Sequence, residues 1–228
     1  MVAAMHMSDG IVDAPTSLLF GALALAVVAV CARRARQELD ERAVPLAGLV
    51  TAFIFAVQLV NFPVLPGVSG HLLGGTLAAV LVGPFTGVLC ISIVLTVQSL
   101  LFADGGVTAL GLNVVNMGVI GVGAGYAVAV LLRRAVGSRA AHPPTLGVIA
   151  AVAGLVGTCC AALGFVAEYA IGGVATTSLP EVAGYLLGTH LLIGVGEGVI
   201  TALTAVAVAR ARPELVYLLR HAPAAVPA

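Results

Sequence analysis

Five long stretches of this 228-residue chain contain no aspartate, glutamate, lysine or arginine. They run from Ala14 to Ala32, Ala43 to Ala103, Gly105 to Leu132, Ala140 to Ala167 and Val182 to Gly196. A helix needs about 20 apolar residues to cross a bilayer. A β-barrel is excluded, because barrel strands are short and alternate polar with apolar residues. With 61% hydrophobic and only 9% charged residues, the chain is predicted to be an all-α integral membrane protein.

Prolines and glycines divide the longest stretch. Pro63, Pro66 and Gly67 interrupt it first, and Pro84 follows beside Gly83. The sequence predicts seven transmembrane helices, near residues 14–32, 46–62, 70–83, 85–103, 107–132, 144–170 and 183–209. The third is short for a crossing, so we expect it to be tilted, partly re-entrant or preceded by irregular backbone that lines a cavity. Residues 1–228 are expected to form a single membrane domain.

The positive charges provide an independent test of that count. The chain has no lysine, and its ten arginines form three groups. The groups are Arg33, Arg34, Arg36 and Arg42; Arg133, Arg134 and Arg139; and Arg210, Arg212 and Arg220. Arginine-rich loops stay cytoplasmic, so an even number of helices must separate neighbouring groups, and four and two do so here. This predicts an N-terminus outside and a C-terminus in the cytoplasm.

Histidines on the predicted outer side are the first candidates for chemistry. His6, His71 and His190 map to that side, while the other two histidines lie near arginines. His6 belongs to the stretch MHMSDG, which begins at Met5 and precedes the first apolar run. His6 and His71 both occur in irregular segments that contain glycine or proline and can fold inward. Two imidazoles beside a chain terminus are compatible with a metal site.

Polar residues within the predicted helices are few and occur in aligned pairs. The pairs are Gln58 with Asn61, Asn113 with Asn116, and His190 with Glu197. Residues three or seven positions apart share a helix face. An ionised Glu197 would cost about 2.5–3.5 kcal/mol in a membrane, so we expect it to be neutral, paired or facing a wet cavity. For the amides, interhelical hydrogen bonding is the ordinary interpretation.

Four motifs together carry a resemblance to a known family. They are MHMSDG, NFPVLPGVSGHLLGGTLAAVLVGPFTG, LLFADGGVTALGLNVVNMG and THLLIGVGEGVITAL. In this order they resemble the CbiM/NikM family, the substrate-binding (S) components of energy-coupling factor (ECF) ABC transporters for cobalt or nickel. The resemblance extends from Met5 to about Val208. It implies a seven-helix membrane fold, which agrees with the count from the arginines.

The resemblance also implies a metal site that contains the chain terminus. In the family, the terminal amine, the amide nitrogen and imidazole of the second residue, and a distant histidine bind the metal; these correspond to Met5, His6 and His71. Amine and amide close a five-membered chelate ring, and amide and imidazole Nδ1 close a six-membered one. A fourth nitrogen completes a square plane, which suits Ni²⁺ or Cu²⁺ and is accessible to low-spin Co²⁺. The sequence does not choose between nickel and cobalt.

Other residues are candidates to support that site. Asp9 is expected to order a loop or to hydrogen-bond the ligands, and Asp13 and Ser8 are alternative N-caps of the first helix. The remaining second-shell or structural candidates are Ser69, Asn61, Asn113, Asn116, His190 and Glu197. The letters MVAA precede Met5 and would turn its amine into a peptide nitrogen. We expect a start at Met5, with trimming or a different binding mode as the alternatives.

The chain is expected to be a transport component and not an enzyme, with the metal as its cargo and no cofactor. A Walker phosphate loop requires lysine, which is absent. The resemblance implies a location in the cell membrane, a transmembrane coupling (T) subunit, cytoplasmic ATPase subunits and often a small accessory membrane subunit. One alternative is a haem-binding redox subunit that uses His71 and His190. Another is an intramembrane hydrolase that uses Ser69 or Ser99 with His71, but HExxH and GxSxG motifs and a convincing acid partner are missing.

Overall fold

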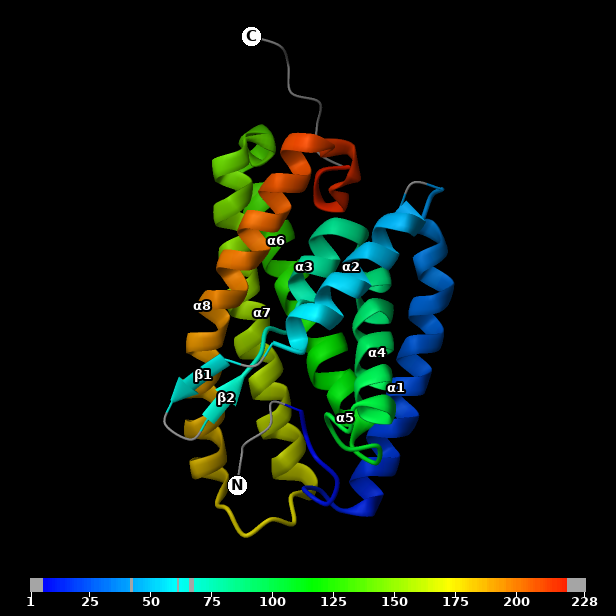
Figure 1. Ribbon diagram of the computed structural model, residues 1–228, viewed down its shortest axis with the longest axis vertical. Helices are drawn as coiled ribbons and strands as arrows, with labels where there is room; N and C mark the ends of the chain where they lie inside the picture. Colours follow the sequence, from blue (N-terminus) through cyan, green and yellow to red (C-terminus); the bar gives the residue numbers. More distant parts are fainter. Residues whose placement is uncertain (1–5, 42, 61, 66–67, 221–228) are drawn as a thin grey trace.

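The computed structural model describes residues 6–41, 43–60, 62–65 and 68–220 (Figure 1). Its elements are α1 (Ala14–Arg34), α2 (Ala43–Gln58), β1 (Phe62–Leu65), β2 (Val68–Gly70), α3 (Gly75–Val82), α4 (Pro84–Leu101), α5 (Leu110–Asn113), a π-helical turn η2 (Val114–Gly121), α6 (Val122–Val136), α7 (Pro143–Gly172) and α8 (Leu179–Ala211). Short 3-10 turns cover Ala35–Gln37, Gly137–Ala141, Pro213–Leu215 and Tyr217–Leu219. Because α5, η2 and α6 are continuous, the described residues form the seven predicted helices.

Five of the helical segments in the described part of the chain are long and apolar enough to cross a membrane. They cover residues 14–37, 84–101, 110–141, 143–172 and 179–211. Helix α2 is apolar but shorter. Large apolar side chains remain exposed on the outside of the bundle, with Leu18 76% and Leu25 75% exposed, as lipid-facing positions require. The chain is a multi-pass membrane protein.

The helix starts follow local capping chemistry. The carboxylate of Asp13 accepts the backbone N–H of Thr16 at 2.9 Å, so Asp13 and not Ser8 is the N-cap of α1. Helix α8 begins with a capping box in which Ser178 and Glu181 satisfy each other's backbone amides. This signal places the start of α8 ahead of the predicted residue 183.

A small β-hairpin is a local departure from the otherwise all-α fold. Helix α2 ends at Gln58, and the antiparallel pair β1–β2 follows where helices had been expected to end at 62 and begin at 70. The reason is local, because proline restricts the preceding residue to extended conformations and lacks an N–H for a central strand. Pro63 lies in β1, and a two-stranded hairpin has only edge strands.

The short helix α3 lies at the centre of the bundle. All eight of its residues are buried, and it contacts α2, α4, α6, α7 and α8. Glycine allows one of these approaches, since a Cβ at Gly125 of α6 would lie 2.0 Å from Thr76 Oγ1. Residues 71–74, which precede α3, are irregular, as predicted for a helix too short to cross alone.

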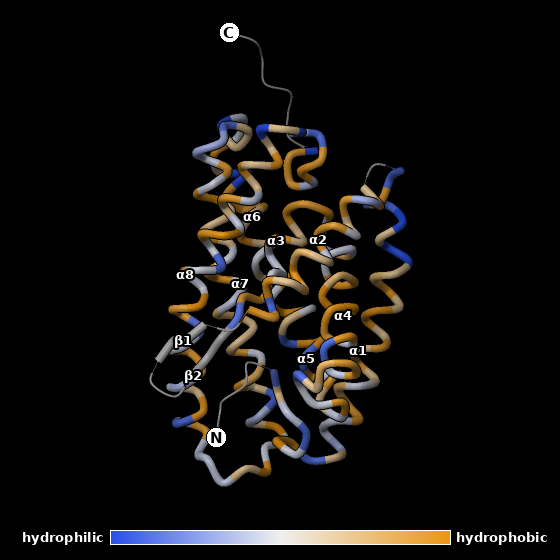
Figure 2. Tube along the Cα trace, in the orientation of Figure 1, coloured by the Kyte–Doolittle hydropathy of each residue, from blue (hydrophilic) through white to orange (hydrophobic). Residues whose placement is uncertain are grey.

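The two ends of the bundle differ in charge. The last turns of α1, α6 and α8 all contain arginines, and these turns lie at the same end of the molecule (Figure 1). We call it the arginine end. Hydrophilic residues are dense there, while apolar residues dominate the middle of the bundle (Figure 2). Residues 6–13 and the start of α1 lie toward the opposite end, which we call the histidine end.

Candidate metal centre

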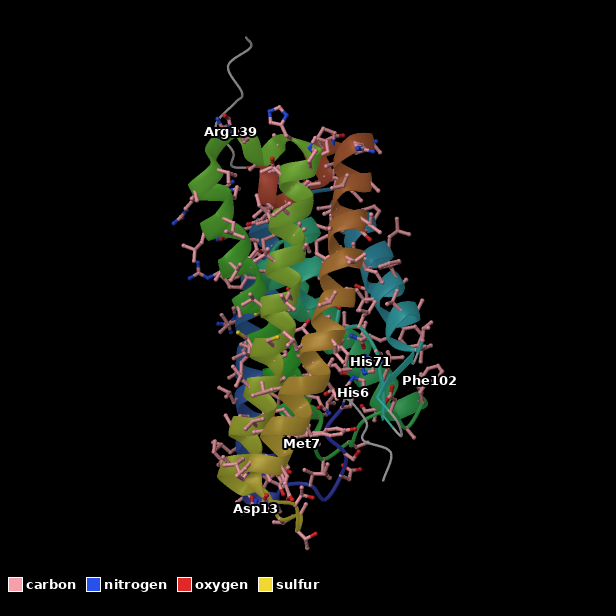
Figure 3. All side chains as sticks on the ribbon, turned by 90° about the vertical axis from the view of Figure 1, so that its left-hand side faces the viewer. His6, Met7, Asp13, His71, Phe102 and Arg139 are labelled. Carbon is pink, nitrogen blue, oxygen red and sulfur yellow. The ribbon has the colours of Figure 1, made fainter. Side chains whose placement is uncertain are left out.

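Two histidines from distant parts of the sequence meet inside the bundle. His6 lies in the segment before α1, and His71 lies between β2 and α3. Their ring centroids are 4.7 Å apart and the ring planes are inclined by 42°. Both residues are buried, with 1% and 2% exposure. Figure 3 shows the pair nearer to Asp13, at the histidine end, than to Arg139 at the arginine end.

In the described part of the chain, each of these rings has one nitrogen in a hydrogen bond and one without a partner. His6 Nδ1 is 3.0 Å from the carboxylate of Asp104, and His71 Nδ1 donates to the carbonyl oxygen of Leu72 at 2.9 Å. The Nε2 atoms of His6 and His71 are buried and have no partner among the described residues. Buried polar atoms without partners are rare and call for an explanation, such as a ligand.

The charge states of this cluster favour a neutral, electron-donating imidazole at His71. Burial, together with the neighbouring His6 ring, lowers the pKa of His71 to about 4. The hydrogen bond from His6 holds the pKa of Asp104 below its ordinary value. At neutral pH the His71 ring is therefore uncharged, and since its Nδ1 carries the proton, the lone pair of Nε2 is available.

The observed orientation of His6 differs from the chelate that the resemblance implied. That chelate uses His6 Nδ1 together with the backbone nitrogen of the same residue, but Asp104 occupies Nδ1 here. Chelation through Nδ1 would therefore require the ring to turn away from Asp104. Met5, the third predicted ligand, lies outside the described residues.

The backbone next to His6 is fixed by Asn113 of α5. The Met7 N–H donates to Asn113 Oδ1 at 2.8 Å, and Asn113 Nδ2 donates back to the Met7 carbonyl at 3.0 Å. The same carbonyl also accepts the N–H of Gly106 at 3.0 Å. This reciprocal pairing holds an irregular segment inside the bundle and leaves its main-chain groups satisfied.

Asp9 connects the N-terminal segment to the loop between α4 and α5. Its carboxylate accepts the backbone N–H of Thr108 at 2.8 Å and also the Thr108 hydroxyl. These bonds hold the pKa of Asp9 below its ordinary value. The two segments approach closely, since a Cβ at Gly106 would lie 2.3 Å from the Asp9 nitrogen. Asp9 thus orders the loop and does not contact either histidine ring through a hydrogen bond in the described structure.

Two buried side chains hold the segment that carries His71. Glu197 of α8 accepts the backbone N–H groups of Leu73 and Gly74 at 2.9 and 2.8 Å. Gln58 of α2 donates to the Leu73 carbonyl at 2.6 Å. Hydrogen bonds to a carboxylate are stronger than neutral ones, so Glu197 is the main anchor of residues 71–74.

His190 and Asn116 make their hydrogen bonds to other partners than the histidine pair, although His190 lies close enough to His71 to act on it electrostatically. His190 Nδ1 donates to the Leu186 carbonyl of its own helix at 2.8 Å. Asn116 donates to the buried Glu168 of α7 at 3.0 Å. Both residues line a small cavity together with Leu73. Asn113 and Asn116, although three positions apart, therefore serve different partners.

The remaining sequence candidates contribute nothing that can be described at the pair. Asn61 and the side chain of Ser69 lie outside the described residues. Ser99 donates to the carbonyl of Thr96 in its own helix. Within the described residues, no group of three or more His, Cys, Asp and Glu side chains is arranged to hold a metal ion. A metal at His6 and His71 would need ligands of other kinds as well.

Sequence reasoning overlooked Asp104 and gave Gln58 no role at the site. Asp104 is the single charged residue between two of the longest charge-free stretches, which end at Ala103 and resume at Gly105. An isolated charge at such a position is a functional candidate by default, so the signal was present. The partner of Gln58 is a backbone carbonyl, which no residue pattern reveals.

Comparison with known proteins agrees with this structure. A putative fused nickel transport protein NikMN of Archaeoglobus fulgidus is 39% identical over 217 residues, covering 93% of this chain and 68% of that protein. The cobalt transport protein CbiM of Sorangium cellulosum is 34% identical, covering 97% of this chain and 100% of that protein.

Solved structures and a family model give the same assignment. A crystal structure of a transition metal transporter matches with a TM-score of 0.80 at 27% identity, covering 91% of this chain and 93% of that one. A truncated transition metal transporter matches with a TM-score of 0.77 at 28% identity, covering 96% and 100%. Residues 6–215 match the model described as the cobalt uptake substrate-specific transmembrane region. The chain therefore belongs to the CbiM family, and the resemblance seen in its four motifs is confirmed.

Proposed function

We propose that this chain is the substrate-binding membrane component of an ECF-type ABC importer for Ni²⁺ or Co²⁺. The observation that carries the proposal is the pair of buried imidazoles, His6 and His71, whose Nε2 atoms have no hydrogen-bond partner among the described residues. Imidazole nitrogens suit divalent ions late in the first transition series. The named functions of the relatives, nickel and cobalt transport, agree with this donor set.

The proposed ligands are Met5, His6 and His71. Met5 would supply its amine only if the mature chain begins there, because a peptide nitrogen binds metal only after deprotonation. With two imidazoles and an amine, the ion has nitrogen donors and no carboxylate. Such a set is poor for Mg²⁺ and Ca²⁺, which prefer oxygen ligands. Selection of transition metals over these abundant ions thus follows from ligand chemistry.

The proposed topology places the histidine end outside the cell and the arginine end in the cytoplasm. The positive-inside rule supports this orientation, since the arginine-bearing ends of α1, α6 and α8 lie together. The metal would then enter from the outer side and reach a site next to the N-terminal end of the central helix α3. Residues 1–228 would form one membrane domain.

Energy for import would come from other subunits. The chain lacks the lysine of a Walker loop, so ATP hydrolysis would belong to cytoplasmic ATPase subunits linked through a transmembrane coupling subunit. A small accessory membrane subunit would assist metal loading. The haem alternative is not proposed, because the structure pairs His71 with His6 and not with His190, whose Nδ1 binds its own helix.

Metal content tests this proposal directly. The protein is produced from Met1 and from Met5 in medium with equal nickel and cobalt, washed with chelator and analysed by mass spectrometry. We expect about one ion per chain in the Met5 form and little in the Met1 form, because only the former has an amine beside His6. Equal retention by the H71A variant would refute the assigned site, while H142A serves as the matched control.

A further inference from the structure

We propose that a groove beside α1 at the arginine end binds an anionic phospholipid, with an acyl chain in the groove and the phosphate on Arg33 and Arg34. None of the residues that line the groove belongs to the metal centre described above, so the proposal does not depend on metal binding. In the proposed orientation the lipid belongs to the cytoplasmic leaflet, where anionic lipids give the membrane surface a negative potential.

The groove lies between α1, α4 and the start of α6, and α1 is at the edge of the bundle beside α4 (Figure 1). Its volume is about 360 Å³, and its walls are apolar. They include Val27, Val30 and Cys31 of α1, Phe85 and Val88 of α4, and Gly123 of α6. Val30 is 52% exposed and Phe85 is 37% exposed, so the groove is open to the membrane. Lipid tails are as apolar as such walls, so an acyl chain can fill it.

The face of α1 that lines this groove continues to an arginine. Arg34 lies seven, four and three positions after Val27, Val30 and Cys31, so these four residues share one helix face. Arg33 precedes Arg34 in the same last turn of α1, and both side chains are exposed. The arginine ion pairs in the described part of the chain are those of Arg212 and Arg220. The two guanidinium groups of α1 are therefore available to a ligand.

The charges beside the groove favour a phosphate. Glu38 is the first carboxylate after these arginines in the sequence, but it is buried and accepts the N–H groups of Phe85 and Thr86. It is thus satisfied within the protein. Arginine binds phosphate through paired N–H groups. Because the arginines adjoin an apolar groove, one surface matches both the phosphate and the acyl chain of a lipid, and the net positive charge selects an anionic headgroup over a zwitterionic one.

A second apolar groove, of about 480 Å³, lies between α2 and α4 and lacks this combination. Its α2 wall, which includes Gly48, belongs to a helix without charged residues. Its lining residue Leu39 is followed in the sequence by Asp40, Glu41 and Arg42, which are charges of both signs. We therefore expect lipid in this second groove without a preference for a negative headgroup.

Glycines in the two grooves provide matched variants. A Cβ at Gly123 or at Gly48 would have no atom of a neighbouring segment within 4 Å, so leucine enters open space at either position. Native mass spectrometry of the detergent-solubilised protein measures binding of phosphatidylglycerol and of phosphatidylcholine with the same acyl chains. We expect the wild type to prefer phosphatidylglycerol, G123L to lose that lipid and G48L to keep it. No preference in the wild type, or unchanged binding by folded G123L, would overturn the proposal.

The double variant R33Q/R34Q tests the headgroup contact. Each basic residue near an anionic membrane surface contributes roughly a fivefold factor in affinity, so loss of both should weaken phosphatidylglycerol binding about 30-fold. The charge-matched control R139Q/R210Q removes two exposed arginines of the same end that lie on other elements, and it should bind this lipid as the wild type does. Equal losses in the two double variants would reveal general attraction to the arginine end and refute a specific site.

Two further outcomes distinguish other occupants of the groove. Inorganic phosphate at the concentration of the lipid should not displace phosphatidylglycerol, because it has no acyl chain to bury. Displacement by phosphate alone would assign the arginines to a free anion and overturn the lipid site. If G123L releases a copurifying membrane protein while its lipid binding is unchanged, the groove is a protein interface and the proposal fails.

Discussion

Two buried glutamates, Glu197 midway along α8 and Glu38 between α1 and α2, accept backbone N–H groups in the same way but in different surroundings. Glu197 accepts the N–H groups of Leu73 and Gly74 next to His71. Glu38 accepts the N–H groups of Phe85 and Thr86 at the start of α4, at 3.1 and 2.6 Å. Both carboxylates are at most 3% exposed, and both satisfy orphan amides near a helix N-terminus, where negative charge is favoured.

The surroundings of the two glutamates differ in how completely they are satisfied. At Glu38, the Thr86 hydroxyl also donates to the carboxylate and Arg220 donates to the backbone carbonyl. Near Glu197, the Nε2 atoms of His6 and His71 lack described partners. Satisfied polar groups rigidify a structure, whereas unsatisfied ones are costly unless something binds them. The surroundings of Glu38 thus favour stability, whereas the unpartnered ring nitrogens near Glu197 favour a ligand.

Removal of the His71 imidazole should produce the largest effect on binding. We expect H71A to lower metal affinity more than about 100-fold, beyond the range typical of residues that only support a ligand. The protein should remain folded, because His71 Nε2 makes no hydrogen bond to any described residue. Isothermal titration with Ni²⁺ and Co²⁺ measures the loss of affinity. Retention of tight binding would contradict the role of His71 as a metal ligand.

The paired variants E197A and E38A test the comparison itself. Each leaves two backbone amides without an acceptor, so each should lower stability by about 2–4 kcal/mol. Only E197A should also weaken metal binding, by about 10- to 100-fold, because only Glu197 anchors the His71 segment. Thermal unfolding in detergent and metal titration of both proteins separate the effects. A similar loss of metal affinity in E38A would show that the surroundings of Glu38 and the metal site are not independent.

Gln58 should contribute a smaller, supporting effect. Its amide donates one neutral hydrogen bond to the Leu73 carbonyl, worth about 1 kcal/mol. Since Glu197 holds the same segment by two stronger bonds, we expect Q58A to reduce metal affinity by less than about tenfold. Titration of Q58A and of the double variant Q58A/E197A tests whether the two anchors act on one segment. Purely additive losses would argue against a shared role.

His190 should matter least for binding. Its Nδ1 donates to the Leu186 carbonyl of its own helix. His190 also lines a small cavity together with Leu73. We expect H190A to change metal affinity by much less than about tenfold, which is the smallest effect typical of residues that support a metal ligand. A loss as large as that of H71A, in the same titration, would instead indicate that the cavity behind Leu73 is part of the metal site.

Much of the fold was predictable because a membrane imposes strong local rules. Long charge-free stretches led to seven helices, and Asp13 was already a candidate cap for α1. The hairpin at residues 62–70 was missed because an apolar run was extended through prolines whose restriction favours strands. The start of α8 was placed late because the capping box of Ser178 and Glu181 was not considered.

The sequence by itself determined the class of the protein, its helices and the residue types able to bind a metal, since these depend on composition and short-range spacing. Only the tertiary structure decided that His6 meets Asp104, 98 positions away, and that Glu197 anchors the backbone after His71. The reason is physical. Irregular backbone inside a membrane protein must find hydrogen-bond partners wherever packing supplies them, and packing joins residues with no common sequence pattern.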